Sequence, residues 1–203
     1  MNDRAYTLVY SAVLGVACAA LLTGVGQFTK KYRDANANAE KYRNVLHVLG
    51  VPLSPKSSAS ELVKLFNQFV REEGLEGRTF YRYVDGVGGN VKSVAVEFRG
   101  MGLWGPIRGL LALEPDMTTI RSVSFYEQEE TPGLGGEIGS EWFQAQFEGK
   151  KVAGKDGAPG IRILKGKGAA TEQNEVDGIT GATLTCAKVE GILNDVIRTL
   201  KKE

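Results

Sequence analysis

The sequence predicts an α+β protein in which a single N-terminal transmembrane helix precedes a soluble domain with a mainly antiparallel sheet flanked by helices. Residues 6–28 include no charged residue and form a run long enough to cross the hydrocarbon layer as a helix. Residues 79–84 and 91–98 alternate apolar and polar residues on either side of a turn, and residues 110–113 and 120–126 indicate two further strands, so an antiparallel sheet is expected. Helical spacing of apolar residues before and after this region predicts the flanking helices.

The first 29 residues are predicted to be an uncleaved transmembrane signal anchor. A cleaved signal peptide is the alternative, but it usually has a shorter apolar core and a small-x-small site after it, which residues 24–27 match poorly. Cys18 follows Gly15-Val16-Ala17, which is a weak match to a lipoprotein-type site. We therefore expect the span to remain part of the protein.

Residues 30–60 are predicted to form a stalk helix and a linker. Apolar residues recur at helical spacing over residues 34–49, and Gly50 and Pro52 then stop the helix. Residues 52–60 are rich in serine and proline, which is typical of a linker.

Residues 61–203 are predicted to form the soluble domain. It begins with a helix at 61–73, and a glycine-rich turn at 85–90 then joins the two strands of a hairpin. In chain order, the expected elements after the first helix are strands at 79–84, 91–98, 110–113 and 120–126, a short helix at 142–147, an exposed loop at 149–160 and a strand at 161–164.

Composition excludes several classes of function. The net charge of +1 and the lack of an arginine-rich patch argue against nucleic-acid binding. Cys18 and Cys186 lie in segments of different character, so we expect no disulfide between them. One histidine and two cysteines give no cluster with zinc or iron–sulfur spacing, so no metal site is expected. Any redox centre must therefore be an organic cofactor or belong to a partner.

Residues 177–185, with the sequence Asp-Gly-Ile-Thr-Gly-Ala-Thr-Leu-Thr, are the stretch most suggestive of chemistry. Apolar residues recur at helical spacing from Val189 to Leu200, which places Thr183 in the first turn of the last helix. A helix start has unpaired backbone N–H groups and partial positive charge, both of which suit a phosphate. The alternative is that Thr180 or Thr183 merely caps the helix.

This Gly-Ala-Thr segment (177–185) resembles the D-x-[ILT]-[ST]-G-A-T-x-[ST] motif of the membrane-associated FMN-binding domain family. A Thr-Pro-Gly segment (130–138) resembles the E-T-P-G-L-G stretch of that family. A Gly-Leu-Trp segment (102–106) resembles the G-L-W stretch found in the C-type subunits of sodium-translocating NADH:quinone oxidoreductases. The three segments occur in the family's order over about the last half of the chain.

The resemblance implies that FMN is joined covalently, by a phosphoester, to Thr183. It implies no catalytic residue in this chain, and it places Asp177 where it shapes the turn or serves a maturation enzyme. Lys165 lies where the family has a lysine upstream of the motif, and a positive charge there would favour a reduced, anionic flavin. The other implied cofactor-binding residues are Thr180, Gly181, Ala182, Leu184, Thr185, Glu130, Thr131, Gly133, Leu134, Gly135, Leu103 and Trp104.

The function implied is that of a membrane-anchored electron carrier in a respiratory, ion-translocating oxidoreductase complex, relaying electrons between NADH and quinone and inactive alone. Its partners would be the membrane, flavin and iron–sulfur subunits of the complex, and an FAD-dependent flavin transferase would attach the FMN. The related G-type component of the Rnf-type ferredoxin:NAD oxidoreductase is an alternative, and a non-redox bitopic scaffold is an alternative of another class.

The resemblance also implies a single-pass protein of the bacterial inner membrane with its FMN domain on the periplasmic side. Lys30, Lys31 and Arg33 follow the span, and the positive-inside rule taken alone would keep the domain in the cytoplasm. Large domains are exported despite such flanking charges, so we follow the family here.

Overall fold

The computed structural model describes residues 3–75, 77–86, 89–155, 157–166 and 168–200, and the chain divides into two compact units between Lys41 and Tyr42. Residues 3–41 of helix α1 (Asp3–Leu49) belong to the first unit, and its residues 42–49 belong to the second. Its segment Tyr6–Lys30 has a mean hydropathy of 2.1 and is long and apolar enough to cross a membrane.

The last turns of α1 belong to the core of the second unit, where Val45, Leu46 and Leu49 are fully buried. The Arg43 guanidinium donates hydrogen bonds to the carbonyl oxygens of Pro55 (3.2 Å) and Ser57 (2.9 Å). These bonds hold the segment that was predicted to be a linker against the helix. The assignment of separate roles to residues 1–29, 30–60 and 61–203 stays a prediction.

Helix α2 (Ala59–Phe69) is shorter than the helix predicted at 61–73. Ser58 caps its first turn by accepting a hydrogen bond from the Glu61 N–H (3.3 Å). The chain then enters strand β1 (Val70–Leu75), which pairs antiparallel with the next strand. The prediction was wrong at this end because the hydrogen bonds to that partner strand, which no local pattern reveals, replace the helical ones.

Five strands form an antiparallel meander with the order β1-β2-β3-β4-β5, which confirms the predicted fold class. One face of the sheet carries Phe98 and Phe125, which contribute to the main core. Their rings pack edge to face with their centroids 5.5 Å apart. The opposite face carries Tyr81, whose ring packs edge to face against Phe66 of α2 with a centroid separation of 6.1 Å. The strands after β1 are β2 (Arg78–Val84), β3 (Val91–Met101), β4 (Pro106–Leu113) and β5 (Ile120–Glu127).

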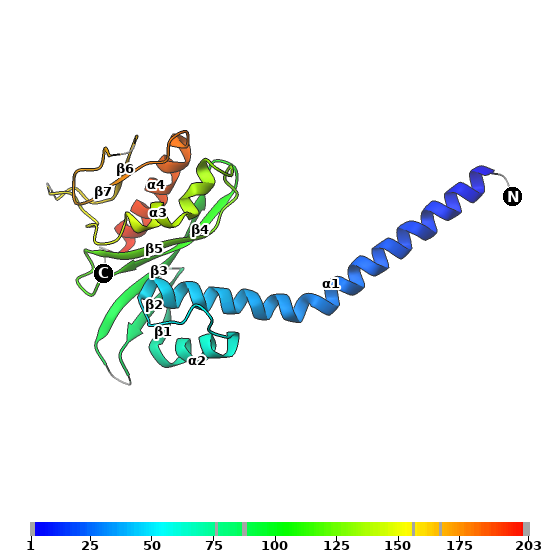
Figure 1. Ribbon diagram of the computed structural model, residues 1–203, viewed down its shortest axis with the longest axis horizontal. Helices are drawn as coiled ribbons and strands as arrows, with labels where there is room; N and C mark the ends of the chain where they lie inside the picture. Colours follow the sequence, from blue (N-terminus) through cyan, green and yellow to red (C-terminus); the bar gives the residue numbers. More distant parts are fainter. Residues whose placement is uncertain (1–2, 76, 87–88, 156, 167, 201–203) are drawn as a thin grey trace. The chain divides into compact units, whose positions relative to one another are not determined.

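Figure 1 shows helices α3 and α4 on one side of this sheet and α2 on the other. After β5 the chain forms the 3₁₀ helix η1 (Gly135–Gly139) and then helix α3 (Glu141–Ala145). A helix was predicted here at 142–147, so α3 begins one residue earlier and ends two residues earlier. Helix α4 (Thr183–Leu200) closes the core with Val189, Leu193 and Val196.

A second, two-stranded sheet lies between α3 and α4 in the sequence. Strand β6 (Arg162–Leu164) pairs in parallel with β7 (Glu175–Asp177), and only β6 was predicted. The loop predicted to be exposed at 149–160 is partly structured: Lys151 forms a bridge with Thr119, and Val152 is buried in the core. The prediction was wrong at Val152 and Gly160, which are buried, while residues 149, 155 and 157–159 are exposed as predicted.

Candidate functional site

Thr183 begins helix α4, and its side chain is exposed. The first helical hydrogen bond runs from the Cys186 N–H to the carbonyl oxygen of Ala182 (2.9 Å), so the residue in the capping position has no side-chain acceptor. Among the described residues, neither the hydroxyls of Thr180 and Thr183 nor the backbone N–H groups of residues 183–185 have a hydrogen-bond partner. The helix start therefore offers free donors to an anion, and the simple capping alternative is not supported.

A cavity of about 340 Å³ beside Thr183, called the first cavity here, brings the three sequence segments together. Trp104 is 69% exposed and Leu184 is 63% exposed at its rim, which is unusual for apolar side chains of this size. Such a concave apolar site suits a flat ring. The residues lining the first cavity are Leu103, Trp104, Thr131, Leu134, Gly135, Gly181, Ala182, Thr183, Leu184 and Thr185.

The Thr-Pro-Gly segment forms the tight turn that its sequence predicts. The Leu134 N–H donates to the carbonyl oxygen of Thr131 (3.1 Å), and Gly133 at the third position has φ +73°. The turn directs Leu134 onto Gly181, where an added Cβ would lie 2.9 Å from Leu134 Cδ2. Gly181 also has φ +80°, a backbone conformation that strains any other residue, so glycine is strongly favoured there.

Glu130 and Thr185 bind each other at the back of the first cavity. Thr185 is 2% exposed, and its hydroxyl donates to Glu130 Oε2 (2.6 Å). That proton is committed to the carboxylate, so in this arrangement Thr185 does not donate it to a phosphate. Glu130 Oε1 accepts from the backbone N–H groups of Leu103 (2.7 Å) and Trp104 (3.1 Å).

A second cavity of about 390 Å³ lies beside the same Gly-Ala-Thr turn and is also lined by Thr180, Gly181 and Thr183. It contains Lys165, which is exposed, so the predicted lysine shares a cavity with the motif. Cys186 also lines it, and burial raises the pKa of its thiol. Thr183 thus lies between an apolar cavity and one lined by both the Lys165 ammonium group and the Glu190 carboxylate.

Asp177 holds the loop that follows Lys165. Its carboxylate accepts hydrogen bonds from the N–H groups of Gly168 (2.6 Å) and Ala170 (2.8 Å). These bonds hold the pKa of Asp177 below its ordinary value of 3.8. Its backbone N–H donates to Gln146 Oε1 (2.9 Å), which ties the strand to the segment after α3. Asp177 therefore shapes the loop that contains Gly168 and Ala170, and its predicted role in the Gly-Ala-Thr turn or in maturation stays a prediction.

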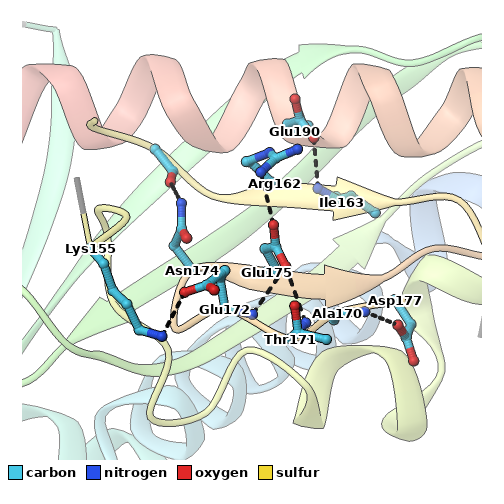
Figure 2. Close-up of polar contacts among 11 residues, drawn as sticks. Lys155, Arg162, Ile163, Ala170, Thr171, Glu172, Asn174, Glu175, Asp177 and Glu190 are labelled. Carbon is cyan, nitrogen blue, oxygen red and sulfur yellow. Dashed lines mark hydrogen bonds and ion pairs between the residues drawn. The ribbon is translucent and has the colours of Figure 1, made fainter. Parts of the chain in front are cut away.

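The side chains around β6 and β7 form a polar network that sequence reasoning missed (Figure 2). Glu175 is 4% exposed, pairs with Arg162 (2.8 Å) and accepts from the N–H groups of Thr171 and Glu172. From α4, Glu190 accepts from the Ile163 N–H (2.6 Å). Polar residues on one helix face could have signalled this role, but a solvated face has the same pattern.

Replacing Asp177 with asparagine should remove a pH dependence from the 165–170 loop. Because the folded pKa is lowered, the carboxylate stabilises the loop above pH about 4, and that stabilisation is lost as the pH falls further. NMR shifts of the Gly168 and Ala170 amides should titrate in the wild type and not in the variant. Asp195→Asn, which removes an exposed carboxylate of α4, is the control and should leave the titration unchanged.

Residues 102–198 match the FMN-binding domain family. The C subunit of the Na(+)-translocating NADH-quinone reductase of Yersinia pestis is 28% identical over 231 residues, covering 93% of this chain and 86% of the relative. The same component of the Neisseria meningitidis serogroup A enzyme is 39% identical over 121 residues, covering 58% of this chain and 46% of the relative. The more similar stretch thus spans about half of that relative's length.

Solved structures resemble the fold over most of the chain. The C subunit of the Na(+)-translocating NADH-quinone reductase of Parabacteroides distasonis has a TM-score of 0.65 and 28% identity, covering 82% of this chain and 92% of that one. Shewanella oneidensis NqrC has a TM-score of 0.68 over 83% of this chain and 100% of that one, with 22% identity, so its likeness concerns the fold alone. The match to the FMN-binding domain family, at residues 102–198, contains all three sequence segments and both cavities.

Proposed function

We propose that this chain carries FMN joined by a phosphoester to the Thr183 hydroxyl. The proposal rests on one observation: three segments that are distant in the sequence line a single cavity beside the exposed Thr183 hydroxyl. That hydroxyl lies at a helix start whose N–H groups are free. The backbone N–H groups of residues 183–185 would hold the phosphate, and Leu103, Trp104 and Leu134 would shield the ring from water. FMN would supply one-electron and two-electron transfer chemistry.

Attachment requires a separate enzyme, because the described residues around Thr183 include no base in contact with its hydroxyl. Thr183 would supply the oxygen of the new P–O bond, and the phosphoanhydride of FAD would be broken with AMP as the leaving group. The threonine proton would pass to a base of the transferase. This chain is then the acceptor in its own maturation rather than a catalyst.

The partners we propose are the other subunits of an NADH-quinone reductase complex, in which this chain relays electrons. The relatives that are components of such a complex support this assignment, since the Yersinia pestis protein aligns with 93% of the chain. The sequence has no dinucleotide-binding fingerprint and no iron–sulfur ligands, so electrons must arrive from and leave to other subunits. The G-type component of an Rnf-type complex remains the second candidate because the attachment motif is common to both.

Intact mass of the purified full-length chain tests covalent attachment directly. Chain produced together with a flavin transferase should be heavier than chain produced without it by one FMN less one water. A scaffold protein would show the mass of the polypeptide alone in both preparations. Equal masses in the two preparations, with the transferase active on a known substrate, would refute the proposal.

The domain is proposed to lie on the periplasmic side of the membrane. Lys155 lies in the 149–160 loop with its side chain 70% exposed, which makes Lys155→Cys in a Cys18→Ser background a suitable probe. A membrane-impermeant maleimide should label this variant in intact spheroplasts. The Cys18→Ser chain alone is the control and should stay unlabelled, because Cys186 is buried. Labelling only after lysis would place the domain in the cytoplasm, as the flanking charges predict.

A further inference from the structure

The Glu130 carboxylate joins two segments of the chain that meet at the first cavity. It is 4% exposed, and its Oε1 accepts from the backbone N–H groups of Leu103 and Trp104 at 2.7 and 3.1 Å. Its Oε2 accepts from the Thr185 hydroxyl at 2.6 Å. Leu103 and Trp104 form one wall of the first cavity, and Thr185 belongs to the first turn of α4. The carboxylate therefore lies behind the cavity and connects its walls.

Gly102 and Gly135 have no side chain, and this provides the space that the Glu130 carboxylate occupies. A Cβ on Gly102 would overlap Glu130 Oε1. A Cβ on Gly135 would lie 2.8 Å from Glu130 Oε2 and 2.6 Å from Thr185 Oγ1. These glycines come from the Gly-Leu-Trp and Thr-Pro-Gly segments, so both segments are shaped around Glu130.

The charge of Glu130 has no cationic partner in the part of the chain that the structure describes, where no lysine or arginine forms an ion pair with it. A buried carboxylate is costly unless hydrogen bonds satisfy it. Here the three donors and the partial positive charge at the start of α4 provide that compensation. Separating the two segments would break these three hydrogen bonds, two of them from backbone N–H groups, so the contact opposes opening of the cavity wall.

We propose that Glu130 is a positioning residue that locks the Leu103–Trp104 wall onto the first turn of α4 and thereby fixes the cavity beside Thr183. A second consequence rests on the proposed function: its fixed negative charge next to the cavity disfavours the reduced, more negative flavin and lowers the reduction potential. Glu130 acts through the residues it holds rather than by touching the phosphate.

The positioning role is tested on the full-length chain without flavin, by hydrogen exchange of the Leu103 and Trp104 amides. Glu130→Ala should raise their exchange rates about tenfold or more, because a charge-assisted acceptor is lost. Glu130→Gln keeps one carbonyl acceptor and should raise them less. Glu129→Gln removes the neighbouring carboxylate, which is more accessible to solvent, and should leave them unchanged. Unchanged exchange in Glu130→Ala would overturn the proposal.

Folding of each variant is checked by slow exchange of the Leu111 amide in the core strand β4. If Glu130→Ala fails to fold, Thr185→Val replaces it, since that change removes one donor and keeps the carboxylate. It should also speed exchange at Leu103 and Trp104, and unchanged exchange there would count against the proposal.

The charge effect is tested on flavin-loaded chain by redox titration. Glu130→Gln should shift the flavin midpoint potential in the positive direction, and Glu129→Gln should shift it much less because water screens a solvent-accessible charge. Equal shifts, or no shift in Glu130→Gln, would overturn the charge effect. If the wild type acquires no flavin, the proposed function fails, whereas the exchange experiment still decides the positioning role.

Discussion

Thr183→Ala is expected to abolish covalent flavin, reducing in-gel flavin fluorescence of the full-length chain to background. The hydroxyl of Thr183 is exposed between two cavities, and alanine provides no oxygen for a phosphoester. The fold should survive, because alanine is a better helix former than threonine at an exposed position in the first turn. Loss of fluorescence would therefore report the attachment atom rather than unfolding.

Two matched variants define how specific this loss is. Thr183→Ser keeps a hydroxyl at the same position and should retain covalent flavin. Thr180→Ala removes the other hydroxyl of the turn that lines the second cavity and should weaken loading without abolishing it. Fluorescence that persists in Thr183→Ala would move the attachment to another residue and invalidate the assignment.

Gly135→Ala should clearly lower the free energy of unfolding. The new Cβ would meet Thr185 Oγ1 at 2.6 Å and Glu130 Oε2 at 2.8 Å, and both residues are buried. Overpacking of this kind costs about 1–3 kcal/mol of unfolding free energy. Urea unfolding of the full-length chain in detergent, followed by tryptophan fluorescence, would measure the loss.

Gly139→Ala is the matched control, because it lies in the same 3₁₀ helix and its new Cβ would have the Phe125 carbonyl oxygen at 3.9 Å as its nearest neighbour. Its unfolding free energy should stay within about 0.5 kcal/mol of the wild type. If Gly135→Ala were as stable as this control, the segments around Glu130 would have to move aside at little cost. That result would contradict the rigid packing expected from their buried hydrogen bonds.

Elements with a strong local pattern were predictable from the sequence, and those decided by distant partners were not. The predicted strand segments that correspond to β2 to β5 have ends within a few residues of the observed ones. The sequence pattern predicts that the helix continues into strand β1, because the partner strand lies across a turn that the pattern does not mark. Strand β7 has three residues, too few for any periodicity to appear.

The same distinction holds for the site. The resemblance identified the three segments, and the structure gathers residues from each of them around the first cavity. It did not indicate that Glu130 would bind partners 27, 26 and 55 residues away in the sequence. Such contacts depend on how the chain folds back, which a linear motif does not contain. The sequence therefore suggested direct cofactor contacts for Glu130 and Thr185 without revealing the hydrogen bond between them.

The side chains that α4 directs at β6 bear on how this protein behaves among its neighbours. Asn194 accepts from the Ile161 N–H (2.7 Å) and donates to its carbonyl oxygen (3.0 Å), and Glu190 accepts from the Ile163 N–H. An edge strand with free backbone groups is a template for adding a strand from another molecule. Here side chains of α4 already bind both backbone groups of Ile161 and the N–H of Ile163, so this edge of the small sheet is a poor template for adding a strand from a neighbouring molecule.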